Sequence, residues 1–234
     1  MALRTPDPDR PIMNTLIVLA HPEPRSFNGA LFDTAVASLS AAGHRVQSSD
    51  LYRLGFDPVS SRRNFTSVKD PDYLKLQIEE MHASSVGGFA PDIDAEIRKL
   101  EAADLMIWQF PLWWFGLPAV LKGWVDRVFA MGRTYGYGHI YETGLFRGKR
   151  AVLSLTTGGP AEAYMPDGFN GDLDAILRPI QRGILEFTGF SVLRPQVHWQ
   201  PVRVDAQVRQ EWLDAWGQRL RNIHAEQPIQ VGRY

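Results

Sequence analysis

Runs of residues that favour buried strands alternate with helical patterns along most of this chain, and that alternation constrains the fold more than any other feature. Five apolar, partly β-branched runs are predicted strands: 15–20, 45–51, 105–110, 150–157 and 190–197. Helices are predicted at 28–43, about 71–84, 92–104, 118–131, 171–189 and about 205–223. Such alternation predicts an α/β fold with a doubly wound parallel sheet and helices on both faces. For five strands we expect the order 2-1-3-4-5.

The length of 234 residues and a hydrophobic content of 44% suit one domain with a full core. We expect residues 14–224 to form that domain, between a flexible N-terminal tail at 1–13 and a C-terminal tail at 225–234. The N-terminal stretch has no apolar region typical of a signal peptide. Two long excursions, 58–91 and 132–149, exceed ordinary loop lengths and are therefore expected to be functional or interfacial.

Charge and cysteine content exclude several classes of function. The formal net charge of -1 argues against nucleic acid as a partner, because phosphate backbones require a concentrated basic face. The absence of cysteine excludes disulfides, thiolate metal sites and cysteine nucleophiles, and fits a reducing compartment, for which we expect the cytoplasm. No window is apolar enough for a membrane span. With six dispersed histidines, we also expect no metal site.

Three loops are expected to meet at one edge of the sheet. Ligands of open parallel sheets bind at the carboxyl ends of the strands, where the strand order reverses. In the order 2-1-3-4-5, the loops that follow the first, third and fourth strands converge there. Their sequences are AHPEPRSFN at 20–28, FPLWWFG at 110–116 and TTGGPAEAY at 156–164.

The chemistry of these loops is complementary. His21, Ser26 and Asn28 lie where a helix opens, and free N–H groups with the helix dipole favour a phosphate there. An alternative is that Ser26 and Asn28 only cap the helix. The aromatic loop is either a hydrophobic plug or a bed for a flat ligand. Gly158 and Gly159 let a flat group approach the backbone closely. A phosphate site beside aromatic faces suits a flavin.

At these residues the chain resembles the NAD(P)H:quinone oxidoreductase family, which has a flavodoxin-like fold. The resemblance extends from about residue 14 to 224. The matching stretches are AHPEPRSFN (20–28), SDLY (49–52), LEAADLMIWQFPLWWFGLPAVLKGWVDRVF (100–129), AVLSLTTGG (151–159) and ILRPIQRGILEFTGF (176–190). The resemblance implies a homodimer with a shared active site and one FAD per subunit, with FMN the less favoured cofactor.

The resemblance also assigns roles to individual residues. Matching positions that hold the cofactor are His21, Ser26, Phe27, Asn28, Pro111, Leu112, Trp114, Phe115, Thr156, Thr157, Gly158, Gly159, Tyr164, Arg209 and Leu213. Those that correspond to catalytic positions are Tyr164, Asn170, Gly158 and Gly159. The substrate pocket would be walled by Trp114 and Phe115, with Tyr135, Tyr137 and Phe187 supplied by the partner subunit. Trp113 matches a variable position and is expected to be a plug.

The chain also departs from the family pattern. Asn170 stands where the family's larger member has a histidine, and an amide cannot take up a proton. Arg182 and Glu186 replace the two histidines of the shorter paralogue's zinc site. The family's glutamine near the adenine is replaced by Lys75 or shifted to Gln77, which weakens the case for FAD over FMN.

The resemblance implies a two-electron ping-pong reaction in which hydride passes from NAD(P)H through the flavin to small quinones, with a role in detoxification. The alternative from another class is a flavin-bound regulatory subunit of a potassium-efflux system, which would use the same loops. A one-electron carrier of the flavodoxin type is disfavoured, because such carriers usually have a strongly acidic surface and this chain is nearly neutral.

Overall fold

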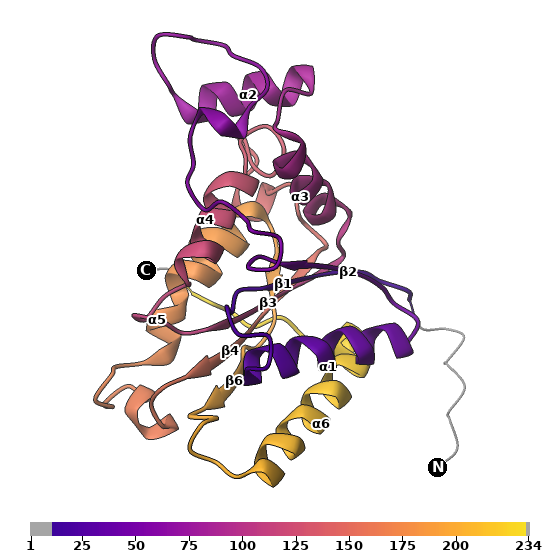
Figure 1. Cartoon of the computed structure of the whole chain (residues 1–234), viewed down its shortest axis with the longest axis vertical. Coiled ribbons are helices and arrows are strands. Elements are labelled where there is room, and N and C mark those ends of the chain that lie inside the picture. Colours follow the sequence, from indigo (N-terminus) through magenta and orange to yellow (C-terminus); the bar gives the residue numbers. More distant parts are fainter. Residues whose placement is uncertain (1–10, 233–234) are drawn as a thin grey trace.

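The computed structural model describes residues 11–232. Its centre is a parallel sheet in the order β2-β1-β3-β4-β5, with β6 also paired to β4 (Figure 1). The strands are β1 (Asn14–Leu19), β2 (Arg45–Asp50), β3 (Leu105–Pro111), β4 (Arg150–Thr157), β5 (Ser191–Val192) and β6 (Gln196–Trp199). The predicted fold class and strand order are confirmed.

The expectation of a single strand at 190–197 is wrong, because the structure has two short strands there. β5 pairs Arg150 with Ser191, whereas β6 pairs Ser154 with Gln196, so the pairing shifts by one residue between them. Pro195 lies in the break, and it has no N–H to donate to a ladder. The extra residue redirects the chain, and the carboxyl end of β6 then lies beside that of β4.

Residues 11–232 contain six α-helices, and most lie close to their predicted positions. They are α1 (Phe27–Ala41), α2 (Leu76–Val86), α3 (Pro91–Ala102), α4 (Ala119–Val128), α5 (Leu173–Ile180) and α6 (Ala206–Asn222). The predicted helix at 171–189 changes type, because α5 passes into a π-helical segment at Gln181–Glu186. Pro179 lies inside α5, where it removes a helical hydrogen bond and accounts for the altered geometry.

The core is divided into two layers by the sheet. In β1, Leu16 and Val18 pack with α3, α4 and α5 on one face, whereas Ile17 packs with α1 and α6 on the other. Successive side chains of a strand point to opposite faces, so a strand covered on both sides is apolar throughout. Figure 1 shows α1 and α6 together on one side of the sheet.

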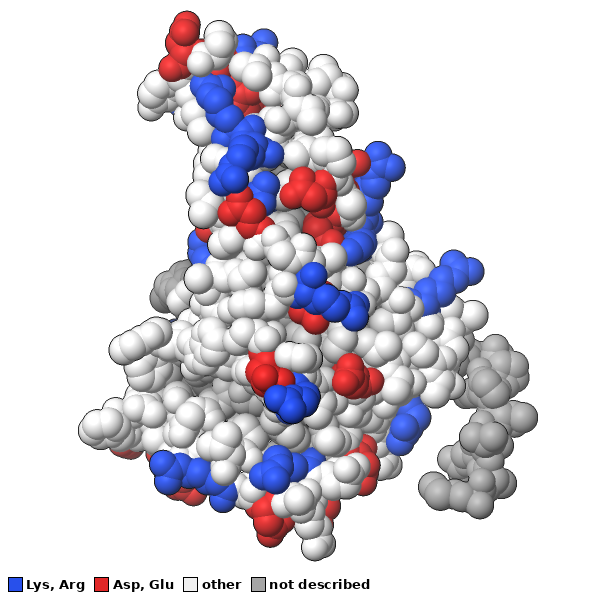
Figure 2. All heavy atoms as spheres, in the orientation of Figure 1, with Lys and Arg blue, Asp and Glu red and all other residues white. Residues whose placement is uncertain are grey.

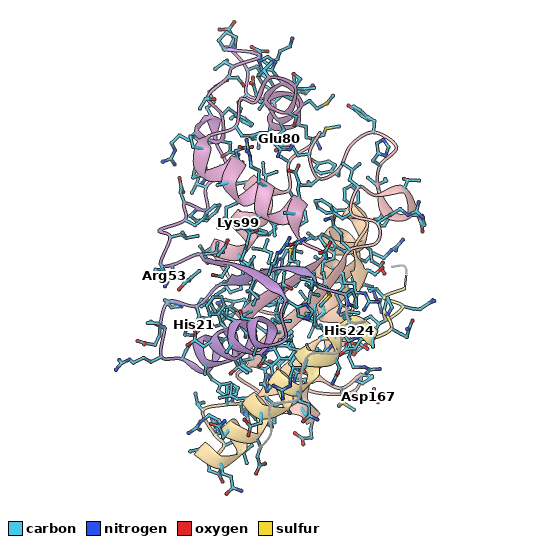
Figure 3. All side chains as sticks on the ribbon, turned by 90° about the vertical axis from the view of Figure 1, so that its right-hand side faces the viewer. His21, Arg53, Glu80, Lys99, Asp167 and His224 are labelled. Atoms are coloured by element: carbon cyan, nitrogen blue, oxygen red, sulfur yellow. The ribbon has the colours of Figure 1, made fainter. Side chains whose placement is uncertain are left out.

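The excursion at 58–91 carries α2 and extends away from the sheet (Figure 1). Arg127 fastens its base by donating to the carbonyl of Asp57 and to Oδ1 of Asn64, at 2.6 and 2.8 Å. Glu80 of α2 accepts a hydrogen bond from the backbone N–H of Met131, which joins the first excursion to the second. Figure 3 places Glu80 far from His21, so this region lies apart from the carboxyl edge of β1.

The described residues next to each end of the chain pack against the domain. Of the N-terminal tail expected at 1–13, residues 1–10 lie outside the described residues, and Met13 is buried with its N–H donated to Nδ1 of His44. In the C-terminal segment expected at 225–234, residues 233–234 lie outside the described residues. The N–H of Ile229 donates to the carbonyl of Val192, and the Ile229 side chain packs against the core.

Two surface properties bear on possible partners. On the face shown in Figure 2, basic and acidic side chains are interspersed, and neither charge forms a continuous field there. Between residues 11 and 232, no helix combines the length and apolar character needed to cross a membrane.

Candidate active site

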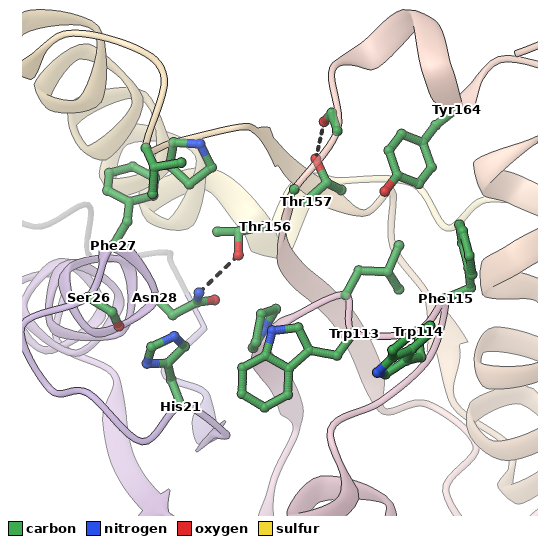
Figure 4. Close-up of a pocket in the computed structure, with 16 residues that line it drawn as sticks. His21, Ser26, Phe27, Asn28, Trp113, Trp114, Phe115, Thr156, Thr157 and Tyr164 are labelled. Atoms are coloured by element: carbon green, nitrogen blue, oxygen red, sulfur yellow. Dashed lines mark hydrogen bonds between the residues drawn. The ribbon is translucent and has the colours of Figure 1, made fainter. Parts of the chain in front are cut away.

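A cleft of about 730 Å³ opens at the carboxyl edge of the sheet (Figure 4). It is bounded by the loops that follow β1, β3, β4 and β6, so segments more than 170 residues apart in sequence form one site. The lining residues are His21, Ser26, Phe27, Asn28, Pro111, Leu112, Trp113, Trp114, Phe115, Thr156, Thr157, Gly158, Gly159, Tyr164, Pro201 and Val202. The three loops predicted to converge do lie together.

The loop after β1 delivers the N-terminus of α1 to the cleft. The Ser26 hydroxyl caps this helix by accepting from the N–H of Gly29 at 3.1 Å. A Cβ on Gly29 would lie only 2.1 Å from the carbonyl oxygen of Pro24, so this tight approach of loop and helix requires glycine. Ser26 is therefore an N-cap, as the alternative expected, and it also lines the cleft. The cap leaves other N–H groups of the first turn without intrahelical acceptors.

Asn28 is not a cap, because it joins three elements beneath the cleft. Its Oδ1 accepts from Nε2 of Gln109 on β3, and its Nδ2 donates to Oγ1 of Thr156 on β4, each at 2.9 Å. All three side chains are buried, and the two hydrogen bonds hold them in one arrangement, although Oε1 of Gln109 has no partner within residues 11–232. Asn28 therefore fixes the loop after β1 relative to the two central strands.

The aromatic loop after β3 has an unusual backbone. Trp114 and Phe115 have φ values of 50° and 57°, and the N–H of Gly116 donates to the carbonyl of Trp113 at 3.0 Å. These are the φ signs of a type I′ turn, whose central positions normally hold Asn or Gly. Each bulky residue in this region costs about 1–3 kcal/mol. Strain of this kind is concentrated at ligand sites, where the surrounding structure imposes it.

The turn directs its aromatic side chains into the cleft and not into the core. Trp114 is 96% exposed and Phe115 is 49% exposed, and both line the cleft. Phe115 also lies against Tyr164, with ring centroids 6.5 Å apart. The structure thus agrees with an aromatic bed for a ligand at these two residues.

Trp113 differs from the expectation that it would be a plug. Its side chain is 42% exposed, lines the cleft, and lies 6.1 Å from the ring of His21 between centroids. In the turn, Trp113 precedes the two strained residues, and its indole lies on the side of His21 (Figure 4). Nothing in the sequence indicated the direction of the Trp113 side chain, because that direction depends on the geometry of the turn.

The loop after β4 supplies a glycine pair and a buried tyrosine. Oγ1 of Thr157 donates to the carbonyl of Gly159 at 2.7 Å, and the carbonyl of Gly158 accepts from Nε2 of Gln200. A Cβ on Gly159 would lie 3.0 Å from the Tyr164 ring and 3.1 Å from the amide nitrogen of Asn170. Gly159 therefore lets Tyr164 and Asn170 close over the backbone.

Six predicted residues do not line the cleft of the single chain: Asn170, Arg209, Leu213, Tyr135, Tyr137 and Phe187. Asn170 lies just behind Gly159. Arg209 donates to the carbonyls of Pro201 and Val204, and Leu213 packs against the core between α1 and α6. Tyr135 and Phe187 lie against each other with ring centroids 5.6 Å apart.

Sequence reasoning missed Pro201 and Val202, which line the cleft after β6. The single strand expected at 190–197 hid the fact that a separate strand ends at Trp199, beside β4. The proline at 195 was the available signal, since proline interrupts a central strand.

Within residues 11–232, the lining of the cleft carries no acidic or basic side chain apart from the His21 ring. Among the lining residues, which all belong to the described part of the chain, there is no Asp, Glu, Lys or Arg. Beneath it, His198 packs edge-on against Phe27, and burial lowers the pKa of His198 to about 4, so this ring is neutral at pH 7. The cleft therefore offers ring faces, hydroxyls and backbone groups, which suit binding a flat cofactor better than acid–base catalysis by paired charges.

Comparison with known proteins identifies the family. A family model described as a flavodoxin-like fold matches residues 13–220. NAD(P)H dehydrogenase [quinone] 1 of Cavia porcellus is 46% identical over 219 residues, which are 93% of this chain and 80% of that protein. Ribosyldihydronicotinamide dehydrogenase [quinone] of Pongo abelii is 45% identical over 215 residues, covering 92% and 93%. The chain belongs to the NAD(P)H:quinone oxidoreductase family.

A solved structure of a similar protein agrees with the assignment to this family. A crystal structure described as a candidate quinone reductase from Klebsiella pneumoniae superposes with a TM-score of 0.88 at 41% identity, covering 93% of this chain and 87% of that one. The resemblance drawn from the blocks at 20–28 and 100–129 is confirmed.

Proposed function

We propose that this protein is a flavin-dependent NAD(P)H:quinone oxidoreductase that uses the cleft for both cofactor and substrates. The observation that carries the proposal is the composition of the cleft, in which aromatic faces, a glycine pair and a helix N-terminus meet without a charged side chain. Such a site has no strong acid, base or nucleophile of its own, so it needs a bound group for redox chemistry. Both relatives reported above are named as quinone dehydrogenases.

The residues present fit a flavin. The faces of Trp114 and Phe115 are free to lie against a flat ring, and the volume of about 730 Å³ is in the usual range for cofactor sites. The open N-terminus of α1, next to His21, suits the phosphates. When bound, flavin supplies two-electron chemistry between a reduced nicotinamide and a quinone.

Tyr164 and the glycine pair would hold the polar edge of the ring. Tyr164 is buried against Trp199 and Phe115, so its hydroxyl has little freedom and remains beside Gly159. Fixed donors at the place where negative charge develops lower the barrier to the reaction, because they need no reorganisation. Asn170, packed beside Gly159, would hold Tyr164 in place through its contact with the same backbone.

For the cofactor itself we propose FAD in preference to FMN. The cleft continues past α1 to Pro201 and Val202, and Arg209 of α6 braces that end through the carbonyls of Pro201 and Val204. An adenosine extension has room there next to α6, where Leu213 also lies.

We further propose that the active protein is a homodimer in the cytoplasm. Apolar side chains are exposed on both excursions, notably Tyr73, Ile78, Met81, Tyr137 and Leu145. Exposed apolar surface of this extent marks an interface. In a dimer, Tyr135, Tyr137 and Phe187 of one subunit would complete the pocket of the other.

The test is turnover. Purified protein with its flavin is mixed with menadione and, separately, NADH, NADPH or dihydronicotinamide riboside, and donor oxidation is followed. We expect quinone-dependent oxidation of at least one donor. Bound flavin without turnover of any donor would contradict an enzyme, and capture of a membrane transporter by that inactive flavoprotein would favour the regulatory alternative.

A further inference from the structure

The indole of Trp113 lies in the half of the cleft nearest α1. Its position is fixed by the turn, because the carbonyl of Trp113 accepts from Gly116 and the neighbouring N–H of Leu112 donates to the carbonyl of Thr156 at 2.8 Å. Figure 4 shows the Trp113 ring directed toward His21, whereas Trp114 lies at the other side of the loop. Two adjacent tryptophans thus serve different halves of one cleft.

The N–H of this indole has no protein acceptor in residues 11–232. By contrast, the N–H of Trp108 points to the sulfur of Met106, and that of Trp124 donates to Oε2 of Glu96 at 2.8 Å. An indole nitrogen is a donor only, so at Trp113 it is available to water or to a ligand in the cleft.

His21 offers a second ring nitrogen on the same side. Its Nδ1 lies 3.1 Å from both the backbone nitrogen and the carbonyl oxygen of Glu23. Nδ1 is therefore engaged by its own loop, whereas Nε2 has no protein partner within residues 11–232. The rings of His21 and Trp113 are 6.1 Å apart between centroids, next to the N-terminus of α1.

No lysine or arginine lines the cleft, so an anion at this helix end would be bound by the helix N–H groups, the indole N–H of Trp113 and the ring of His21. We propose, on the basis of the proposed function, that the indole N–H of Trp113 donates to a phosphate oxygen of the bound flavin nucleotide. Trp113 would thereby favour FMN and FAD over riboflavin. Binding then depends on the phosphate as well as on the flavin ring.

The test compares three flavins on the full-length apoprotein: riboflavin, FMN and FAD. Trp113→Phe keeps an aromatic ring but removes the N–H. We expect its dissociation constants for FMN and FAD to rise about tenfold, as for one lost hydrogen bond to a charged group. The constant for riboflavin, which has no phosphate, should change less than twofold. Trp113→Gln keeps a side-chain N–H of similar reach and should recover most of the loss for FMN and FAD.

Each other outcome overturns the inference. Equal weakening of all three flavins in Trp113→Phe would make Trp113 a packing residue, and no weakening would remove it from the site. Failure of Trp113→Gln to recover phosphate-dependent binding would assign the effect to ring shape. The wild-type protein tests the proposed function as well as this inference, because both are contradicted if it binds none of the three flavins. The variants test only the role of Trp113. Melting temperatures of all variants verify folding, which a half-exposed side chain should affect little.

Discussion

At the scale of single residues, Gly159 shows how little space the site leaves. Its missing Cβ makes room for the Tyr164 ring and the Asn170 amide, which approach that position to 3.0 and 3.1 Å. The position is therefore sensitive to one methyl group, although it is neither charged nor nucleophilic.

We predict that Gly159→Ala lowers flavin affinity and kcat/KM with menadione by about tenfold, because the methyl displaces Tyr164 from the polar edge of the cleft. Ser40→Ala, at an exposed position of α1 that does not line the cleft, is the control. Flavin titration and steady-state kinetics check both variants. Unchanged binding and turnover in Gly159→Ala would remove Tyr164 from its proposed role.

His198 gives a prediction for pH. It is 2% exposed, and burial lowers its pKa from 6.5 to about 4. The unfolded chain takes up a proton below about pH 6.5, whereas the folded protein does not until about pH 4. Stability is therefore complete above pH 6.5 and falls as the pH decreases toward 4, by about 3 kcal/mol in total.

We predict that His198→Phe removes this part of the acid sensitivity, measured as the free energy of unfolding in urea at pH 7 and pH 4.5. The exposed His139→Gln is the control and should keep the wild-type pH dependence. An identical pH dependence in His198→Phe and wild type would show that another group is responsible.

At the scale of elements, the sequence predicted the sheet well and its details less well. The runs at 105–110 and 150–157 are buried on both faces, so their composition identifies them without knowledge of neighbours. Convergence of the loops then follows from topology. The division into β5 and β6 depends on a one-residue shift in pairing with β4, and the direction of Trp113 depends on a turn that aromatic residues rarely adopt. Pro195 was a local signal for the first of these, but nothing in the local propensities indicates the direction of Trp113.

The turn at 113–116 gives a prediction about strain. Trp114→Gly should raise the free energy of unfolding of the apoprotein by about 1 kcal/mol, because glycine adopts a positive φ without cost and the exposed indole loses no packing. The same variant should bind flavin more weakly, since it lacks one face of the bed. Val59→Gly, at an exposed residue without a positive φ, should give no stabilisation. A lower free energy of unfolding for Trp114→Gly in urea would contradict the claim that the positive φ of Trp114 strains the apoprotein.

The loop after β6 gives a prediction about the cofactor. Arg209→Ala removes the donor to the carbonyls of Pro201 and Val204, so the far end of the cleft should loosen. We expect the dissociation constant of FAD to rise about fivefold and that of FMN to change little. Arg203→Ala, at an exposed neighbour, is the control. Equal effects on FAD and FMN in a titration would argue that no adenosine lies there.

At the scale of the whole molecule, Glu80 of the first excursion lies apart from His21 at the carboxyl edge of β1 (Figure 3). The sheet and its helices supply an edge with a cofactor-sized cleft, and the two excursions expose apolar side chains.

The central claim is that the carboxyl edge of the sheet is a flavin site. A crystal structure of the full-length protein grown with FAD tests it most directly. We predict the ring against Trp114 and Phe115, its polar edge at Gly158 and Gly159, and phosphate at the N-terminus of α1 beside His21. Flavin bound elsewhere, or an unaltered cleft at saturating FAD, would contradict the account.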